Sequence, residues 1–97
     1  MAVTVLLELK AKSGTGGGLV EVFKQILPDT RKFDGNISVT TYQNQDDPDT
    51  VVLIEEWESR PAYEKYLGWR QETGALDQLG QAIEGAPSIR YFDATDA

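Results

Sequence analysis

The sequence predicts an α+β fold in which one four-stranded antiparallel sheet carries helices on one face. Four segments alternate apolar and polar residues with the period of a strand, and two longer segments place apolar residues three and four positions apart, as helices do. Their order is strand, helix, strand, strand, helical segment, strand. No internal repeat or linker interrupts the 97 residues, so we expect a single domain over positions 1–97.

The first strand and the first helix are predicted from apolar spacing. In the strand, positions 2–9, every second residue is apolar: Val3, Val5, Leu7 and Leu9. The helix runs to about Thr30 on a stripe of Leu19, Val22, Phe23, Ile26 and Leu27. Pro28 lies inside this stretch, so the helix could kink or end early near Leu27.

A hairpin is predicted next. The turn signal FDGN, positions 33–36, precedes the β-branched segment Ile37–Gln43. The polar loop NQDDPDT then leads to a third strand, VVLIEEW, at Val51–Trp57. A connection of this length joins the two strands as an antiparallel pair.

The C-terminal half predicts helix and then strand. Ser59 is suited to cap a helix that begins near Pro61. The helical pattern continues to about position 83 but is interrupted by Gly68, Gly74 and Gly80. Two short helices are therefore predicted rather than one long helix. With a fourth strand at Ser88–Asp93, the order forms two split βαβ units, which is the ferredoxin-like arrangement.

The third predicted strand is apolar on both faces, through the run Val51, Val52, Leu53 and Ile54. Helices on one side of the sheet leave the other side open, so a second sheet has to cover it. The same face of an identical subunit is the simplest cover. We therefore expect an isologous homodimer, a dimeric α/β barrel, whose two sheets pack together.

Composition excludes several function classes. The chain has 16 acidic and 9 basic residues, and its net charge of −7 disfavours nucleic acid and anionic membrane surfaces as partners. Cysteine and histidine are absent, which excludes disulfides, thiolate nucleophiles, iron–sulfur clusters, histidine metal ligands and histidine bases. No signal peptide or membrane-spanning run is recognisable, so the cytoplasm is the expected compartment.

Two motifs suggest ligand sites but fit them poorly. GTGGG, positions 14–18, has Leu19 where a dinucleotide motif needs glycine, and no Gly-Lys-Ser/Thr follows, so a flexible connecting loop is favoured. DDPD, positions 46–49, lacks the glycine that a calcium loop needs at its sixth position. A solvated hairpin tip is favoured there.

Glu55 and Glu56 end the third strand and point to opposite faces, so they cannot act as a pair on one substrate. One of them facing the interior could be a single base with a raised pKa. A position at the rim, or an ion pair with an arginine, is favoured over that alternative.

The candidate site residues lie at the junction of the third strand and the following helix: Leu53, Glu55, Trp57, Tyr63, Tyr66, Leu67, Trp69 and Arg70. Tyr66 lies three residues from Tyr63 and four from Arg70, so the tips of these side chains can converge. On spacing alone, ordinary core packing with hydroxyls bonded to backbone or water is favoured over a pocket.

The segment FDGNISVTTYQNQDDPDTVVLIEEWESRPAYEKYL, positions 33–67, resembles the antibiotic biosynthesis monooxygenase family. The resemblance covers essentially the whole chain: an initial strand and helix, a tryptophan closing the third strand, Ser-Arg-Pro-Ala-Tyr opening the next helix, and IRYFD near the end. It implies dimeric α/β barrels of ferredoxin-like subunits. Catalytic members oxygenate phenolic or quinol-like polycyclic substrates with O2 and without metal or flavin, so no cofactor is expected.

By position, the resemblance implies that Trp57 lines the cavity and that Tyr63 is the aromatic residue early in the helix. Tyr66 stands where many members have histidine, and an unperturbed tyrosine, with a pKa near 10, is a poor base at neutrality. The haem-degrading relatives depend on an axial histidine, so this chain is not of their type.

We therefore expect a cofactor-independent monooxygenase that acts on a small aromatic substrate with O2. Trp57 and Tyr63 would stack on the ring, Tyr66 would hydrogen-bond an oxygen, and Arg70 would stabilise an anion. The other substrate-binding candidates are Leu53, Glu55, Leu67 and Trp69. Two alternatives stay open: a non-catalytic module that binds a hydrophobic aromatic metabolite, which the missing histidine favours, and an isomerase on the same scaffold.

Overall fold

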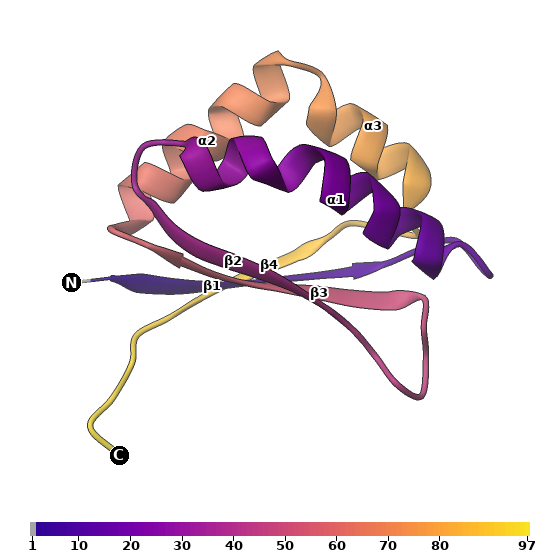
Figure 1. The fold of residues 1–97 in the computed structure, drawn as a ribbon, viewed down its shortest axis with the longest axis horizontal. Coiled ribbons are helices and arrows are strands. Elements are labelled where there is room, and N and C mark those ends of the chain that lie inside the picture. The colour runs from indigo at the N-terminus through magenta and orange to yellow at the C-terminus, as the bar shows by residue number, and fades with distance from the viewer. Residues whose placement is uncertain (1) are drawn as a thin grey trace.

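The computed structural model describes residues 2–97, which form an α+β fold of four strands and three helices (Figure 1). In chain order the elements are β1 (Val3–Lys10), α1 (Gly16–Lys32), β2 (Asn36–Gln43), β3 (Thr50–Trp57), α2 (Arg60–Glu72), α3 (Ala75–Ala82) and β4 (Ser88–Phe92). The predicted order is confirmed, as is the division of the second helical segment into two.

The strands form one antiparallel sheet in the order β2-β3-β1-β4. β1 is central, and its Val5 pairs with Glu55 of β3 on one side and with Tyr91 of β4 on the other. Two split βαβ units produce this order, so the ferredoxin-like arrangement is confirmed. All three helices lie on one face of the sheet (Figure 1).

Alternation along the strands separates an inner face, beneath the helices, from an outer face. On β3 the inner residues are all buried: Val51, Leu53, Glu55 and Trp57. The outer face carries Ile54, which is 38% exposed and pairs with Leu6 of β1, and Val52, which pairs with Tyr42 of β2. The prediction that β3 is apolar on both faces is therefore confirmed.

Gly16–Gly18 of the glycine-rich segment are the first residues of α1, and Gly14 and Thr15 form the turn before it. The Asp49 carboxylate accepts hydrogen bonds from the backbone N–H groups of Gly14 and Gly16, both at 2.9 Å. It thereby satisfies donors that the start of a helix leaves unpaired. A Cβ on Gly16 would lie 2.0 Å from the Pro48 carbonyl oxygen, so the hairpin approaches too closely for a side chain. The predicted flexible loop is wrong, because a distant carboxylate fixes this segment.

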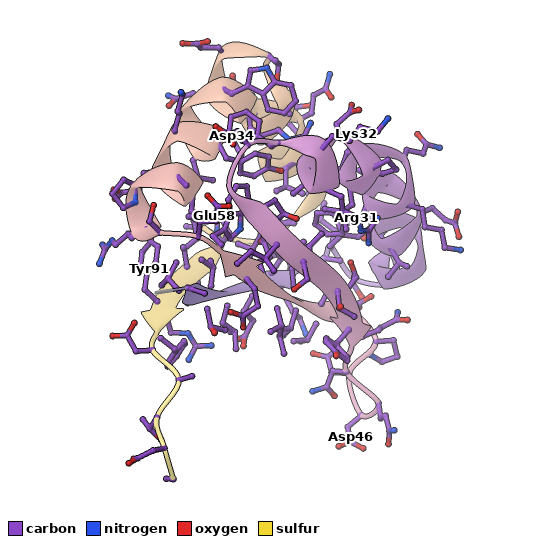
Figure 2. All side chains as sticks on the ribbon, turned by 60° about the vertical axis from the view of Figure 1, so that its left-hand side comes forward. Arg31, Lys32, Asp34, Asp46, Glu58 and Tyr91 are labelled. Carbon is purple, nitrogen blue, oxygen red and sulfur yellow. The ribbon has the colours of Figure 1, made fainter. Side chains whose placement is uncertain are left out.

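The β2–β3 hairpin thus has two parts. Asp46 is exposed at its tip, as predicted (Figure 2). Asp47 forms an ion pair with Lys10 and accepts a hydrogen bond from the Thr50 hydroxyl at 2.8 Å. The acidic segment is therefore largely solvated, as predicted, while Asp47 and Asp49 also hold the hairpin against β1 and the start of α1.

α1 continues through Pro28 and ends at Lys32, so an early end at Leu27 is wrong. Pro28 itself is exposed, whereas Leu27 and Thr30 are buried on the side facing the sheet and α2. Packing of this last turn outweighs the backbone hydrogen bond that proline removes.

The start of α2 follows the prediction. The Ser59 hydroxyl accepts a hydrogen bond from the N–H of Ala62 at 3.2 Å, and Pro61 lies in the first turn. Gly74, with φ of 79°, turns the chain between α2 and α3. Glycine adopts this left-handed conformation at low cost, which explains why one helical segment becomes two. No helix within residues 2–97 is long and apolar enough to cross a bilayer.

Candidate functional site

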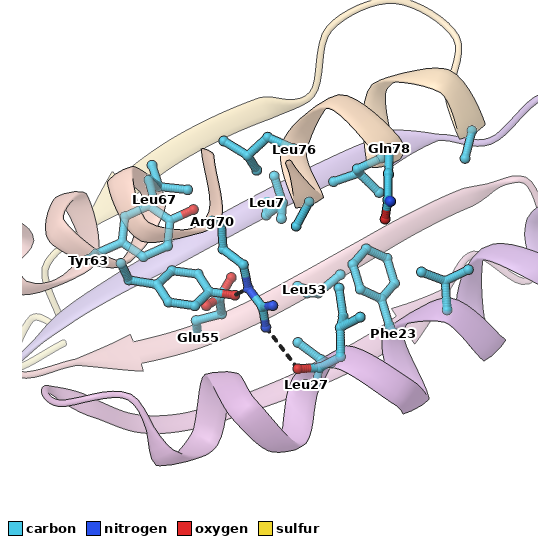
Figure 3. A pocket seen from close by; sticks show the side chains of 16 residues that line it. Leu7, Phe23, Leu27, Leu53, Glu55, Tyr63, Leu67, Arg70, Leu76 and Gln78 are labelled. Atoms are coloured by element: carbon cyan, nitrogen blue, oxygen red, sulfur yellow. Dashed lines mark hydrogen bonds between the residues drawn. The ribbon is translucent and has the colours of Figure 1, made fainter. Parts of the chain in front are cut away.

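A cavity of about 190 Å³ lies between the inner face of the sheet and the helices (Figure 3). The sheet contributes Leu7, Leu53 and Glu55. The helices contribute Val22, Phe23, Ile26 and Leu27 from α1, Tyr63, Tyr66, Leu67 and Arg70 from α2, and Ala75, Leu76, Gln78, Leu79 and Ala82 from α3. Because apolar side chains dominate, the few polar groups determine which ligands fit.

Six of the eight predicted site residues line this one cavity: Leu53, Glu55, Tyr63, Tyr66, Leu67 and Arg70. They come from β3 and α2, the two elements that the sequence analysis joined. The core packing that spacing favoured holds in part, because Leu53, Tyr63 and Tyr66 belong to the buried core and also border this cavity.

Glu55 is the carboxylate of this cavity and is 2% exposed. Its Oε1 accepts a hydrogen bond from the Trp57 Nε1–H at 3.0 Å, and no ion pair within residues 2–97 includes it. Burial raises the pKa of Glu55 from 4.5 to about 7, although the indole hydrogen bond lowers it. The favoured rim or ion-pair position is wrong, and the single interior carboxyl is the arrangement observed.

Trp57 lies behind the cavity wall and does not line the cavity. Its indole is fully buried and packs against Tyr63 and Tyr66, with ring centroids 5.4 and 5.0 Å away. The expectation that Trp57 lines the cavity is wrong for this cavity, because Tyr63 and Tyr66 form its wall at this point. Its connection to the site is the hydrogen bond to Glu55.

Trp69 also lies outside the cavity lining. It packs against Phe33 and Tyr66, with ring centroids 5.4 and 6.1 Å away, and the Arg70 guanidinium carbon lies 4.6 Å from its ring centre. Position 69 falls outside the helical stripe formed by positions 63, 66, 67 and 70, which faces the sheet. Trp69 is therefore not part of the cavity wall.

Tyr63 lines the cavity and is almost fully buried. Its hydroxyl makes no hydrogen bond to the described part of the chain. Burial raises the pKa of this hydroxyl, and the negative charge of Glu55 raises it further. The hydroxyl therefore stays protonated at neutral pH and can donate a hydrogen bond into the cavity.

Tyr66 and Arg70 converge as predicted, but their polar atoms bind other parts of the protein. Tyr66 Oη and Thr30 Oγ1 share a hydrogen bond of 2.6 Å, and Arg70 Nε donates to Tyr66 Oη at 2.9 Å. Arg70 Nη2 donates to the Ile26 carbonyl at 2.8 Å and to Thr30 Oγ1 at 2.9 Å. The hydroxyl of Tyr66 therefore ties α2 to α1.

Thr30 belongs to this network and was missed by the sequence analysis. It is fully buried, one helical turn beyond Ile26 on the inward stripe of α1. A polar side chain that continues an apolar stripe was the available signal. The apolar residues of this stripe end with Leu27, so a pattern of apolar residues alone does not extend to Thr30.

The cavity thus combines a carboxyl group whose pKa lies near neutrality, a protonated phenol and a guanidinium within apolar walls. A carboxyl that is partly ionised at pH 7 can accept a proton from a ligand and return it. Residues 2–97 contain no group of three acidic, histidine or cysteine side chains placed to hold a metal ion.

Several solved structures share this fold. A conserved protein from Methanosarcina mazei Go1 is similar with a TM-score of 0.85 at 17% identity, over 98% of this chain and 94% of that one. Rv0793 from Mycobacterium tuberculosis is similar with a TM-score of 0.84 at 21% identity, over 100% of this chain and 98% of that one. A variant of SnoaB, a cofactor-independent oxygenase from Streptomyces nogalater, is similar with a TM-score of 0.83 at 17% identity, over 99% of this chain and 95% of that one. At these identities the similarity establishes the fold alone.

Sequence comparison defines the family. No curated protein gives a significant match to the chain. The family model described as antibiotic biosynthesis monooxygenase matches residues 2–72, from β1 to the end of α2. The matched range includes β3 and α2, which carry the predicted site residues. The chain therefore belongs to the antibiotic biosynthesis monooxygenase family.

Proposed function

We propose that the protein is a cofactor-independent monooxygenase that oxidises a quinol-like or phenolic aromatic substrate with O2. The observation that carries the proposal is the carboxyl group of Glu55, which lines an apolar cavity and has a pKa of about 7. Such a carboxyl suits the removal of a weakly acidic proton from a bound ring. Membership of the monooxygenase family supports the same assignment.

The reaction begins when Glu55 takes a proton from the hydroxyl group or an activated CH2 carbon of the substrate. The electron-rich anion then transfers one electron to O2, and the substrate radical and superoxide combine to form a C–O bond. The resulting peroxide anion takes the proton back from Glu55. Loss of water from this hydroperoxide leaves a carbonyl group. One oxygen atom enters the product, and the other leaves in water with one hydrogen from the oxygenated ring carbon and the proton that Glu55 first removed.

Neighbouring residues have distinct roles in this proposal. Trp57 holds Oε1 of Glu55, so that Oε2 faces the ligand. Tyr63 donates a hydrogen bond to the oxyanion that develops on the substrate. Tyr66 holds the Arg70 guanidinium in place, and Leu53 and Leu67 with the other apolar residues exclude water, which strengthens these interactions.

The outer face of the sheet is the proposed homodimer interface. It exposes apolar side chains on three strands, including Tyr42, Ile54 and Phe92, which are 53, 38 and 46% exposed. Burying them against the same face of a second copy would remove them from water. Sedimentation should give a dimer for the natural chain and a monomer for Ile54→Asp. A compact monomer for the natural chain would contradict this interface.

Oxygen consumption with a panel of hydroquinones and anthrones tests the function. We expect turnover with at least one substrate and a roughly 10²- to 10⁴-fold loss for Glu55→Gln, the range typical of a general base. Glu56→Gln is the matched control, because Glu56 is the next residue on β3 but faces outward, where it accepts a hydrogen bond from Thr4. Lack of turnover across the panel, or equal rates for the two variants, would contradict the proposal.

Isomerisation of a ring metabolite is the second candidate, favoured by the same near-neutral carboxyl. A base with this pKa can return the proton to a different carbon of the same ligand. Anaerobic incubation separates the two candidates. An isomeric product formed without O2 would indicate the isomerase, whereas an oxygenase forms product only when O2 is supplied.

A further inference from the structure

Arg70 is a buried cation without an acidic partner. It is 7% exposed, and the ion pairs within residues 2–97 do not include it. Its three hydrogen-bond acceptors are all uncharged oxygens, on Ile26, Thr30 and Tyr66. A buried charge of this kind is costly until an opposite charge approaches it.

One nitrogen of this guanidinium is available to a ligand. Nε and Nη2 are engaged with the protein, whereas Nη1 donates no hydrogen bond to the described residues. Asn36 Oδ1 is the single side-chain polar atom of those residues that is both fully buried and without a partner. Because Nη1 is also without a partner, it cannot be fully buried. Nη1 therefore reaches open space, and the space that Arg70 lines is the cavity (Figure 3).

The same reasoning applies to Glu55, which lines the cavity with Arg70. Its Oε1 is held by Trp57, and its Oε2 has no partner among the described residues. The cavity thus offers two polar contacts of different kinds. One is a fixed positive donor, and the other is a carboxyl oxygen that can exchange a proton.

The size of the cavity limits what can reach both contacts. An apolar protein cavity of about 150 Å³ is known to hold benzene. A volume of about 190 Å³ is somewhat larger and holds one ring or two fused rings, so a third fused ring would extend beyond the cavity.

We infer that the natural ligand is a one- or two-ring aromatic that carries an anionic oxygen, bound by Arg70 Nη1, and a second, ionisable hydroxyl group that faces Glu55. This inference rests on the proposed function for the identity of the site, and it narrows the substrate from phenolic polycycles to small hydroxyaromatic anions. Arg70 selects the charge, Glu55 receives the hydroxyl proton, and the apolar walls select the ring size.

Calorimetric binding to the natural chain without oxygen tests the charge requirement. Benzoate and benzamide have nearly the same shape but differ in charge. We expect benzoate to bind roughly 10- to 100-fold more tightly, the factor that one charge-assisted hydrogen bond supplies. Equal affinities, or no binding of either compound or of 4-hydroxybenzoate, would overturn the inference.

A ring series tests the size limit. Benzoate and 2-naphthoate should bind, and anthracene-2-carboxylate should bind at least tenfold more weakly than 2-naphthoate. Tightest binding by the three-ring acid would overturn the limit. Binding of the small acids without any oxygen consumption on their hydroxylated forms would instead refute the proposed monooxygenase activity and leave the ligand class intact.

Arg70→Met assigns the charge preference to its residue. We expect the preference for benzoate over benzamide to disappear in this variant and to persist in Lys65→Met, which removes the same charge from an exposed position on α2. A preference that survives in folded Arg70→Met would overturn the assignment. If Arg70→Met does not fold, Arg70→Gln, which keeps a polar side chain but removes the charge, should lose the preference while benzamide binding is retained. An unchanged preference there counts against the role of Arg70.

Discussion

Trp57 and Glu55, two residues apart on the inner face of β3, are joined by a hydrogen bond of 3.0 Å from the indole Nε1–H to the carboxyl Oε1. Burial raises the pKa of this carboxyl, and the indole bond limits the rise because it stabilises the charged form. In the proposed mechanism Trp57 therefore acts through Glu55, as a positioning residue outside the cavity wall.

Trp57→Phe should shift the pH dependence of the reaction. Loss of the indole donor raises the pKa of Glu55 further, so the acid limb of the kcat/KM profile should move to higher pH. Activity at pH 7 should fall roughly tenfold, as expected for loss of one hydrogen bond to a charged group. Trp69→Phe is the control, because Trp69 contacts the same aromatic cluster without bonding Glu55. An unchanged midpoint in Trp57→Phe would show that the indole is only a packing element.

Glu55 should make the protein less stable at high pH. A carboxyl whose pKa is raised on folding contributes stability below its unfolded pKa of 4.5, and this stability is lost as the pH rises through about 7. The loss should be about 3 kcal/mol in the free energy of unfolding. Urea unfolding between pH 4 and pH 8 should show this fall in the natural chain and not in Glu55→Gln.

The comparison with Glu55→Gln isolates Glu55 from the other groups of the cavity. Tyr63, Tyr66 and Arg70 line the same space and are present in both chains. The pKa of Tyr63 is raised away from this pH range, so its hydroxyl does not contribute. A pH dependence that is the same in both chains would contradict the raised pKa of Glu55.

Tyr66→Phe should destabilise the protein because its hydroxyl joins α1 and α2. Removing it leaves Thr30 and Arg70 each without one buried partner, and we expect a loss of about 1–3 kcal/mol in the free energy of unfolding. Thr30→Val should have a similar cost. The double variant should cost less than the two costs combined, since both changes break the same network. Strict additivity by urea unfolding would show that the two hydroxyls act independently.

Gly16 and Gly17 offer a matched pair at the start of α1. A Cβ on Gly16 would meet the backbone of Pro48, whereas a Cβ on Gly17 would meet nothing within 4 Å. Gly16→Ala should lower the melting temperature, because overpacking costs about 1–3 kcal/mol in the free energy of unfolding. Gly17→Ala should raise it slightly, because alanine favours helix by up to about 1 kcal/mol. A neutral Gly16→Ala would show that the hairpin does not press on α1.

The fold was predictable because its signals are local and repeated. Alternation marks each strand, Ser59 and Pro61 mark the start of α2, and glycines mark the break before α3. The glycine-rich segment was not predictable in this way. Its order depends on Asp49, which is 33 residues away from Gly16 in sequence and near it only after folding.

The cavity wall was predictable in part from the sequence. Periodicity placed Tyr63, Tyr66 and Arg70 on one helix face, and all three line the cavity. Periodicity gives no information on depth, so it could not show that Trp57 lies behind the tyrosines. Nor could it show that Glu55 is buried without an ionic partner, because that depends on where every arginine of the folded chain lies.

The central claim is that a carboxyl group titrates near neutrality inside this cavity. NMR of the chain with 13C-labelled glutamate carboxyl groups measures it directly, and Glu55→Gln assigns the signal. We expect one carboxyl signal, absent from the variant, to titrate with a midpoint of about 7. A midpoint for Glu55 near its ordinary value of 4.5 would contradict the account.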